Sequence, residues 1–101
     1  MRRIEIVSPE KAVLAETETS EPARDEVRVR IHQCGICGSD LHAYRGKHPF
    51  IDLPATPGHE TAGVIDLVGS EVTGWKIGDR VCIEPQLICG KCPLCDSGRY
   101  N

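Results

Sequence analysis

The sequence is poor in aromatic residues and contains no long hydrophobic run. It has one Trp, two Tyr and one Phe among 101 residues, and its formal net charge is −3. The few aromatic residues and the slightly negative net charge argue against a nucleic-acid partner, because binding to nucleic acid needs a basic face and stacking aromatic side chains. No apolar stretch approaches the ~20 residues that span a bilayer, and the charged start Met1–Glu5 is not followed by the apolar segment of a secretory signal. We therefore expect a cytoplasmic protein without a membrane partner.

The composition favours one small folded domain. Hydrophobic residues make up 40% of the chain and charged residues 27%, a balance that is not typical of disordered chains. A chain of 11.1 kDa is long enough to bury one hydrophobic core. Neither a repeat nor a low-complexity segment divides the sequence, so we assign residues 1–101 to one domain.

Local sequence patterns predict a mainly β fold. Apolar residues alternate with polar ones, or form short runs between turn residues, at 3–7, 12–15, 27–31, 63–68 and 80–83. One short helix is expected, capped by Gly38 or Ser39, reaching about Arg45 and ended by Gly46. Three prolines between residues 47 and 57 exclude regular structure there. Short strands, glycine-rich turns and one helix indicate a small β-barrel or sandwich.

Three of the six cysteines lie close together near the end of the sequence. They recur every third residue, a spacing typical of zinc sites: Cys89, Cys92 and Cys95. In a reducing compartment, metal-bound thiolates are favoured over disulfides. We therefore predict a structural zinc ion here, with a reduced loop or a disulfide as the alternatives.

A closed structural zinc site needs four ligands, and this cluster supplies three. We therefore expect the cysteine-rich lobe, about residues 85–101, to be irregular and incomplete, and the domain to be truncated. Cys82 lies between two apolar residues of a predicted strand. We expect Cys82 and Cys34 to be packed side chains rather than ligands.

A second possible metal site combines three different residue types, Cys37, His59 and Glu60. A thiolate, an imidazole and a carboxylate are zinc ligands that leave room for a water molecule or a substrate oxygen. The Gly-His-Glu triplet that contains His59 is weak evidence by itself, because a histidine is more often an ordinary hydrogen-bonded residue.

Four motifs follow one another along the chain: residues 37–42 (CGSDLH), 58–60 (GHE), 78–81 (GDRV) and the three-cysteine lobe. In this order and approximate spacing, the sequence resembles the medium-chain zinc-dependent alcohol dehydrogenases. Residues 78–85 and 98–101 are most similar to the polyol, sugar-acid and threonine dehydrogenase branch. The resemblance implies the N-terminal catalytic domain of these enzymes, a partly open β-barrel like the co-chaperonin GroES.

The resemblance also implies a catalytic zinc site. Cys37 and His59 correspond to its first two protein ligands, and Glu60 to an acid that can approach the metal during exchange. The third ligand of the family is expected beyond residue 101. Asp40 corresponds to the carboxylate that accepts a hydrogen bond from the ligand histidine and fixes its tautomer.

Two further residues correspond to a proton relay. Ser39 matches the hydroxyl that receives the substrate proton, because a hydroxyl both donates and accepts a hydrogen bond. His42 matches the histidine that passes the proton to solvent, since histidine titrates near neutrality. A plain position on the helix surface is the alternative for His42.

The family reaction transfers hydride from a secondary alcohol to NAD or NADP. The sequence contains no Gly-x-Gly-x-x-Gly motif, so we assign no cofactor-binding residue and expect a missing dinucleotide-binding domain. The parent enzyme is expected to act on a small-molecule alcohol and to be a homo-oligomer, a dimer or tetramer. The fragment alone is expected to be inactive. Two alternatives are a free-standing zinc-binding interaction module and a co-chaperonin-like structural subunit.

Overall fold

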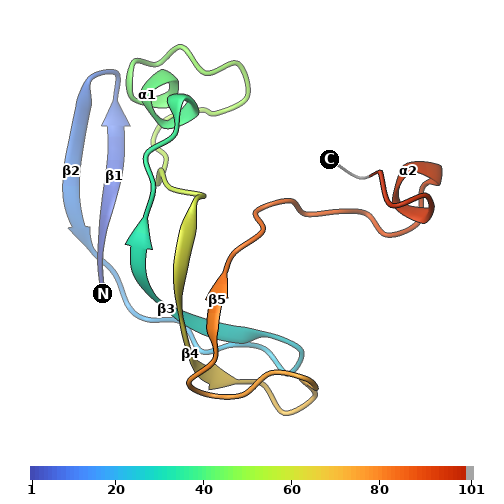
Figure 1. Ribbon diagram of the computed structural model, residues 1–101. Coiled ribbons are helices and arrows are strands. Elements are labelled where there is room, and N and C mark those ends of the chain that lie inside the picture. Colours follow the sequence, from blue (N-terminus) through green and yellow to red (C-terminus); the bar gives the residue numbers. More distant parts are fainter. Residues whose placement is uncertain (100–101) are drawn as a thin grey trace.

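The computed structural model describes residues 1–99, which form two antiparallel sheets, one helix beside them and a projecting lobe (Figure 1). The elements are β1 (Arg2–Ser8), β2 (Lys11–Glu16), β3 (Val27–Cys34), α1 (Gly38–Tyr44), β4 (Thr61–Val68), β5 (Arg80–Cys82) and α2 (Pro93–Asp96). Residues 100–101, which end the predicted domain, its lobe and the last motif, lie outside the described residues. All five predicted strands and the predicted helix are present, with ends that differ by up to three residues.

The first sheet is the hairpin of β1 and β2, and it is tied to helix α1. Ile6 of β1 exchanges two backbone hydrogen bonds with Ala55, at 2.8 and 3.0 Å. At the hairpin turn, the backbone N–H of Glu10 donates to Tyr44 O at 2.7 Å, and the Tyr44 hydroxyl donates to Glu10 O at 2.6 Å. The bonds between Glu10 and Tyr44 hold the hairpin against the C-terminal end of α1, and those of Ile6 tie β1 to the loop between α1 and β4.

The second sheet has the order β3–β4–β5, so β4 is its central strand. The β3–β4 ladder runs from the pair Val27 and Val68 to the pair Cys34 and Thr61, with two irregularities in register. Ile65 of β4 is only 1% exposed. β3 is three residues longer than the alternation predicts, because pairing with β4 continues to Cys34. This extension carries the chain to the start of α1.

Helix α1 begins one residue earlier than expected. Its N-cap is Cys37, rather than Gly38 or Ser39, and the Asp40 carboxylate accepts a hydrogen bond from the Cys37 N–H at 2.8 Å. An acidic residue at the third helical position that bonds the N-cap N–H is one half of a capping box. The helix ends at Tyr44 with Arg45 as its C-cap, and Gly46 follows with φ of +65°, as predicted.

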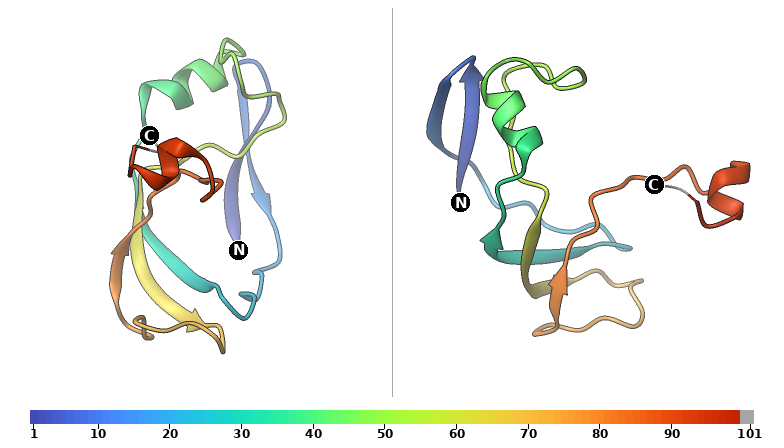
Figure 2. Two further views of the ribbon diagram at one scale, coloured as in Figure 1. Left: turned by 90° about the vertical axis from the view of Figure 1, so that its right-hand side faces the viewer. Right: turned by 45° about the horizontal axis from the view of Figure 1, so that its top comes forward.

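The two sheets do not close on each other, so the barrel is open (Figure 2). A groove of about 940 Å³ lies between them and is lined by residues of β1, β3 and α1. Among the described residues, the buried hydrophobic side chains are Ile6, Ala43 and Ile65. The mainly β, partly open architecture is confirmed, but the core is smaller than the composition indicates, because much apolar surface faces this groove.

The cysteine-rich lobe projects from the sheets on an extended segment after β5 (Figures 1 and 2). It was expected to be irregular, but it contains the one-turn helix α2. Cys34 and Cys82 are exposed, so their expected packing is wrong. Cys82 ends a three-residue strand at the edge of its sheet, where no further strand of residues 1–99 covers it. Within residues 1–99, no helix has the length and hydropathy needed to cross a membrane.

Candidate metal centre

The structure brings Cys37, His59 and Glu60 together. One potential ligand atom of each residue lies within 4.8 Å of those of the other two. Cys37 immediately precedes α1, whereas His59 and Glu60 immediately precede β4. The site therefore forms where the chain leaves β3 and where it enters β4.

The β3–β4 ladder accounts for this approach. The last ladder pair is Cys34 and Thr61, and beyond it the N–H of Gly35 donates to Glu60 O at 2.7 Å. This bond continues the antiparallel pairing by one step, so the segments that lead to Cys37 and back to His59 run side by side. Residues far apart in sequence thus share one end of the sheet.

The Asp40 carboxylate joins the two segments. Its Oδ2 accepts from the Cys37 N–H at 2.8 Å, and its Oδ1 accepts from the Gly58 N–H at 3.2 Å. Oδ1 also lies 3.6 Å from His59 Nδ1, which is longer than a hydrogen bond. The interaction with His59 in this structure is therefore electrostatic, and the bond expected from the resemblance stays a prediction. The two hydrogen bonds that Asp40 accepts from backbone N–H groups were not predicted from the sequence. The signal for the bond from Cys37 is the acidic residue three positions after it.

Electrostatics in this cluster favour the charged forms of Cys37 and His59. Hydrogen bonds from the Ser39 hydroxyl, from the Ser39 backbone and from His59 lower the pKa of the Cys37 thiol. The hydrogen bond with Cys37 raises the pKa of His59 most; burial opposes it, and the charge of Asp40 adds to the rise. The thiolate is the form of cysteine that binds metal ions, so the surroundings prepare Cys37 for that role.

The predicted relay residues Ser39 and His42 both lie on helix α1. Residues three apart on a helix share one face. Ser39 is half-buried beside Cys37, and His42 is exposed in the last turn. Ser39 therefore lies on the side of the metal cluster and His42 on the side of the solvent. The transfer of a proton between the two side chains stays a prediction.

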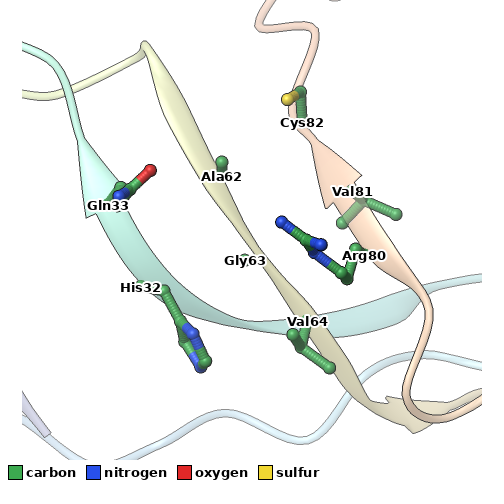
Figure 3. A pocket seen from close by; sticks show the side chains of 8 residues that line it. All are labelled: His32, Gln33, Ala62, Gly63, Val64, Arg80, Val81 and Cys82. Atoms are coloured by element: carbon green, nitrogen blue, oxygen red, sulfur yellow. The ribbon is translucent and has the colours of Figure 1, made fainter.

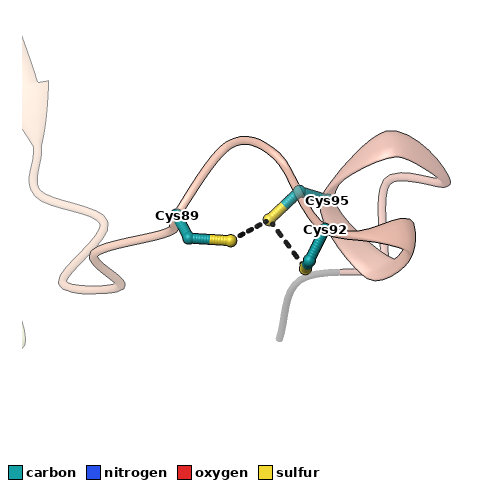
Figure 4. A group of neighbouring side chains, drawn as sticks. All are labelled: Cys89, Cys92 and Cys95. Carbon is teal, nitrogen blue, oxygen red and sulfur yellow. Dashed lines mark hydrogen bonds between the residues drawn. The ribbon is translucent and has the colours of Figure 1, made fainter.

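The lobe forms a second cluster, made of sulfur alone. The Sγ atoms of Cys89 and Cys95 are 3.8 Å apart, and those of Cys92 and Cys95 are 3.6 Å apart (Figure 4). Cys92 is the N-cap of α2 and Cys95 lies within that helix, so one helical turn brings them together. The backbone N–H of Cys95, followed by the thiols of Cys89 and Cys95, lowers the pKa of Cys92 to about 7.

Both clusters fit zinc by their donor atoms. Thiolates around a tetrahedral zinc ion lie ~2.3 Å from the metal, which corresponds to a separation of about 3.8 Å between sulfur atoms. The two sulfur–sulfur separations in the lobe, 3.6 and 3.8 Å, agree with this value. All six cysteines are free thiols, so disulfides do not occupy these positions. The Cys37 cluster adds nitrogen and oxygen donors to one sulfur, a mixed set typical of catalytic zinc.

Two hollows lie near the sheets, and one of them adjoins the Cys37 cluster. A cavity of about 420 Å³ on the β3–β4–β5 sheet is lined by residues 32, 33, 62–64 and 80–82, where Ala62 and Gly63 leave space between His32 and Arg80 (Figure 3). None of the site residues predicted within the described chain lines this cavity. The larger groove between the sheets is lined by Gly35, Asp40 and Gly58, which lie close to the cluster residues along the chain, but not by the three cluster residues themselves.

Comparison with known proteins gives concordant results. Residues 23–101 match the model of the alcohol dehydrogenase GroES-like domain. Starvation-sensing protein RspB of Escherichia coli is 44% identical over 101 residues, which are 100% of this chain and 30% of the relative. Sorbitol dehydrogenase of Bacillus subtilis is 49% identical over 80 residues, 76% of this chain and 23% of that protein.

A solved structure extends the similarity to three dimensions. The crystal structure of an alcohol dehydrogenase from Escherichia coli CFT073 complexed with NADH matches 99% of this chain and 29% of its own, with a TM-score of 0.87 and 41% identity. The chain spans 30% or less of the length of these three proteins.

Proposed function

Because the chain belongs to the family of the alcohol dehydrogenase GroES-like domain, we propose that it forms the zinc-binding part of an NAD(P)-dependent dehydrogenase. The enzyme would oxidise a secondary alcohol in a polyol, a sugar acid or a hydroxy amino acid. One observation carries this proposal. Cys37 and the adjacent pair His59 and Glu60, which are far apart along the chain, present their ligand atoms within 4.8 Å of one another.

The proposal assigns a zinc ion to each cluster. Cys37, His59 and Glu60 would hold the catalytic ion, and the three lobe cysteines would hold a structural ion. A catalytic zinc ion supplies Lewis acidity towards an alcohol oxygen. A protein ligand from outside this chain would complete each site.

The chain's own residues would then orient the site and move one proton. The two backbone bonds of Asp40 hold the Cys37 and Gly58 segments together, and its negative charge favours a fixed orientation of the His59 ring. The Ser39 hydroxyl would accept the proton of the alcohol. His42, one turn along the same face of α1, would pass it to solvent.

The rest of the enzyme is proposed from the relatives. One relative is named a sorbitol dehydrogenase, and the similar crystal structure holds NADH, which supports a polyol-like substrate and a nicotinamide cofactor. About 70% of the relative RspB lies outside the matched part (100 − 30), enough for a dinucleotide-binding domain. We also propose a homo-oligomer, without nucleic-acid or membrane partners, in the cytoplasm, where the six free thiols would stay reduced.

Activity of the full-length protein tests this proposal. The zinc-loaded protein is incubated with a panel of polyols, sugar acids and hydroxy amino acids and with NAD or NADP, and absorbance of the reduced nicotinamide is followed. We expect turnover of at least one alcohol, and a loss of about 100-fold or more in kcat/KM for Cys37→Ser and His59→Ala, since each removes a first-sphere ligand. His32→Ala is the matched control, because His32 is an exposed histidine of β3 that lines the other cavity.

The outcomes separate the alternatives. Zinc binding without turnover of any alcohol would indicate the free-standing zinc-binding module. Full activity of His59→Ala would contradict the assignment of the catalytic site while leaving the family reaction intact.

A further inference from the structure

Gly35 lies two residues before Cys37 and opposite Glu60, where the β3–β4 pairing ends. Its N–H donates to Glu60 O at 2.7 Å. A Cβ atom built at position 35 would lie 2.5 Å from Glu60 Oε2 and 3.0 Å from Glu60 Cβ. Real Cβ atoms essentially never approach another heavy atom to 2.5 Å. The Glu60 carboxylate therefore occupies space that any side chain at position 35 would take.

We propose that Gly35 is a positioning residue that keeps the Glu60 carboxylate within reach of the metal held by Cys37 and His59. The inference rests on the function proposed above, and it adds to that function a residue that makes no direct contact with the metal. It also gives a physical reason why this position of the Cys34–Cys37 segment has no side chain.

The size of the required movement supports this role. Ordinary van der Waals contact begins at 3.4 Å, so an alanine at position 35 would push Oε2 away by about 0.9 Å (3.4 − 2.5). Metal–ligand distances vary by only about 0.2 Å in well-formed sites. A displacement several times this tolerance would remove the carboxylate from the first coordination sphere.

The backbone at position 35 does not itself require glycine. Gly35 is absent from the glycines with positive φ, so alanine can adopt its conformation, and alanine keeps the N–H that bonds Glu60 O. The closest atom is the far end of an exposed, flexible side chain, and the contact with Glu60 Cβ at 3.0 Å needs a shift of only a few tenths of an ångström. Gly35→Ala should therefore fold normally while the Glu60 carboxylate turns aside.

Gly38 supplies a matched control. It lies three residues further along the same segment, and an added Cβ there meets no atom within 4 Å. Gly38→Ala introduces the same methyl group beside the same ligand, Cys37. It differs from Gly35→Ala in leaving the Glu60 carboxylate undisturbed.

The experiment uses Co²⁺ as the probe in the full-length protein, because Co²⁺ bound to thiolate has visible d–d and charge-transfer bands that report coordination geometry. Spectra and Co²⁺ affinity, from competition with a chromophoric chelator, are measured for the native protein, Gly35→Ala, Gly38→Ala, Glu60→Ala and Gly35→Ala/Glu60→Ala. The lobe cysteines are the same in every protein, so their contribution cancels in the difference spectra. Circular dichroism confirms that each variant is folded.

We expect Gly35→Ala to weaken Co²⁺ binding at this site by about 10–100-fold and to shift its d–d bands towards those of Glu60→Ala. The double variant should match Glu60→Ala, because without the carboxylate the added methyl group has nothing to displace. Gly38→Ala should match the native protein.

Two results would overturn the inference in different ways. If Glu60→Ala changes the spectrum and Gly35→Ala does not, Gly35 has no positioning role, and the function proposed above is unaffected. If Glu60→Ala itself binds Co²⁺ with native affinity and spectrum, Glu60 is not a ligand, and both the ligand assignment and this inference fail.

Discussion

Replacing Asp40 with asparagine should weaken the metal centre and the fold together. The substitution keeps the shape of the side chain but removes the charge and one of two acceptor oxygens. Each oxygen now accepts a backbone N–H, from Cys37 at 2.8 Å and from Gly58 at 3.2 Å. In asparagine, the amide NH₂ would face one of these donors. The side chain is only 14% exposed, so water replaces the lost acceptor poorly.

The expected magnitude follows from these contacts. A hydrogen bond to a charged group contributes about 1.5–3 kcal/mol, and at least one such bond is lost. We therefore expect Asp40→Asn to lower the free energy of unfolding by about 2 kcal/mol. Zinc affinity at the Cys37–His59 cluster should fall by about 10–100-fold, since the charge beside the ligand histidine is removed.

Urea denaturation followed by circular dichroism measures the first effect, in the presence of a chelator so that metal binding makes no contribution. Competition with a chromophoric chelator measures the second. Asp52→Asn is the control, because Asp52 is an exposed acidic residue of the loop after α1. An Asp40→Asn protein with native stability and native zinc affinity would refute the role of this carboxylate.

Two other groups give predictions about pH. The hydrogen bond from Arg28, at 2.9 Å, lowers the pKa of Asp66 below its usual value of 3.8, so this pair stabilises the fold above that pH and its contribution is lost as the pH falls further. Thermal unfolding midpoints of the native protein and Asp66→Asn should therefore differ at pH 6 and converge near pH 2; an equal difference at both would contradict this. In the lobe, the pKa of Cys92 is about 7, so in metal-free protein at pH 8 most of it is thiolate. Iodoacetamide should modify Cys92 before Cys34, as peptide mass spectrometry can show, and the reverse order would disagree.

Much of the fold could be predicted because its signals are local. Alternation around Val27, Val29 and Ile31 identifies β3, and Gly46 marks the end of α1. The last three residues of β3 carry no such alternation and are extended because they pair with β4. Cys82 shows a related limit: its position in a strand indicates which face it lies on, but not whether another element covers that face.

The candidate site, too, could be predicted from the sequence only in part. The ligand types and their spacing, together with the family resemblance, are sufficient to select Cys37, His59 and Glu60, which the structure brings together. The bond from the Cys37 N–H to Asp40 could have been found from helix-capping rules. The contact between Gly35 and Glu60 could not, since it depends on the register in which β3 and β4 meet.

The two clusters also differ in the length of chain that must close to form them. The lobe cysteines lie within seven residues, and the backbone hydrogen bonds of α2 and the turn after it remain within residues 92–99. Cys37 and His59 are 22 positions apart (59 − 37) and meet only after β3 pairs with β4. Closing a short segment costs less entropy and is faster than forming a non-local pairing. The three lobe sulfur atoms can therefore come together whether or not the sheet has formed, whereas the Cys37 cluster exists only after β3 pairs with β4.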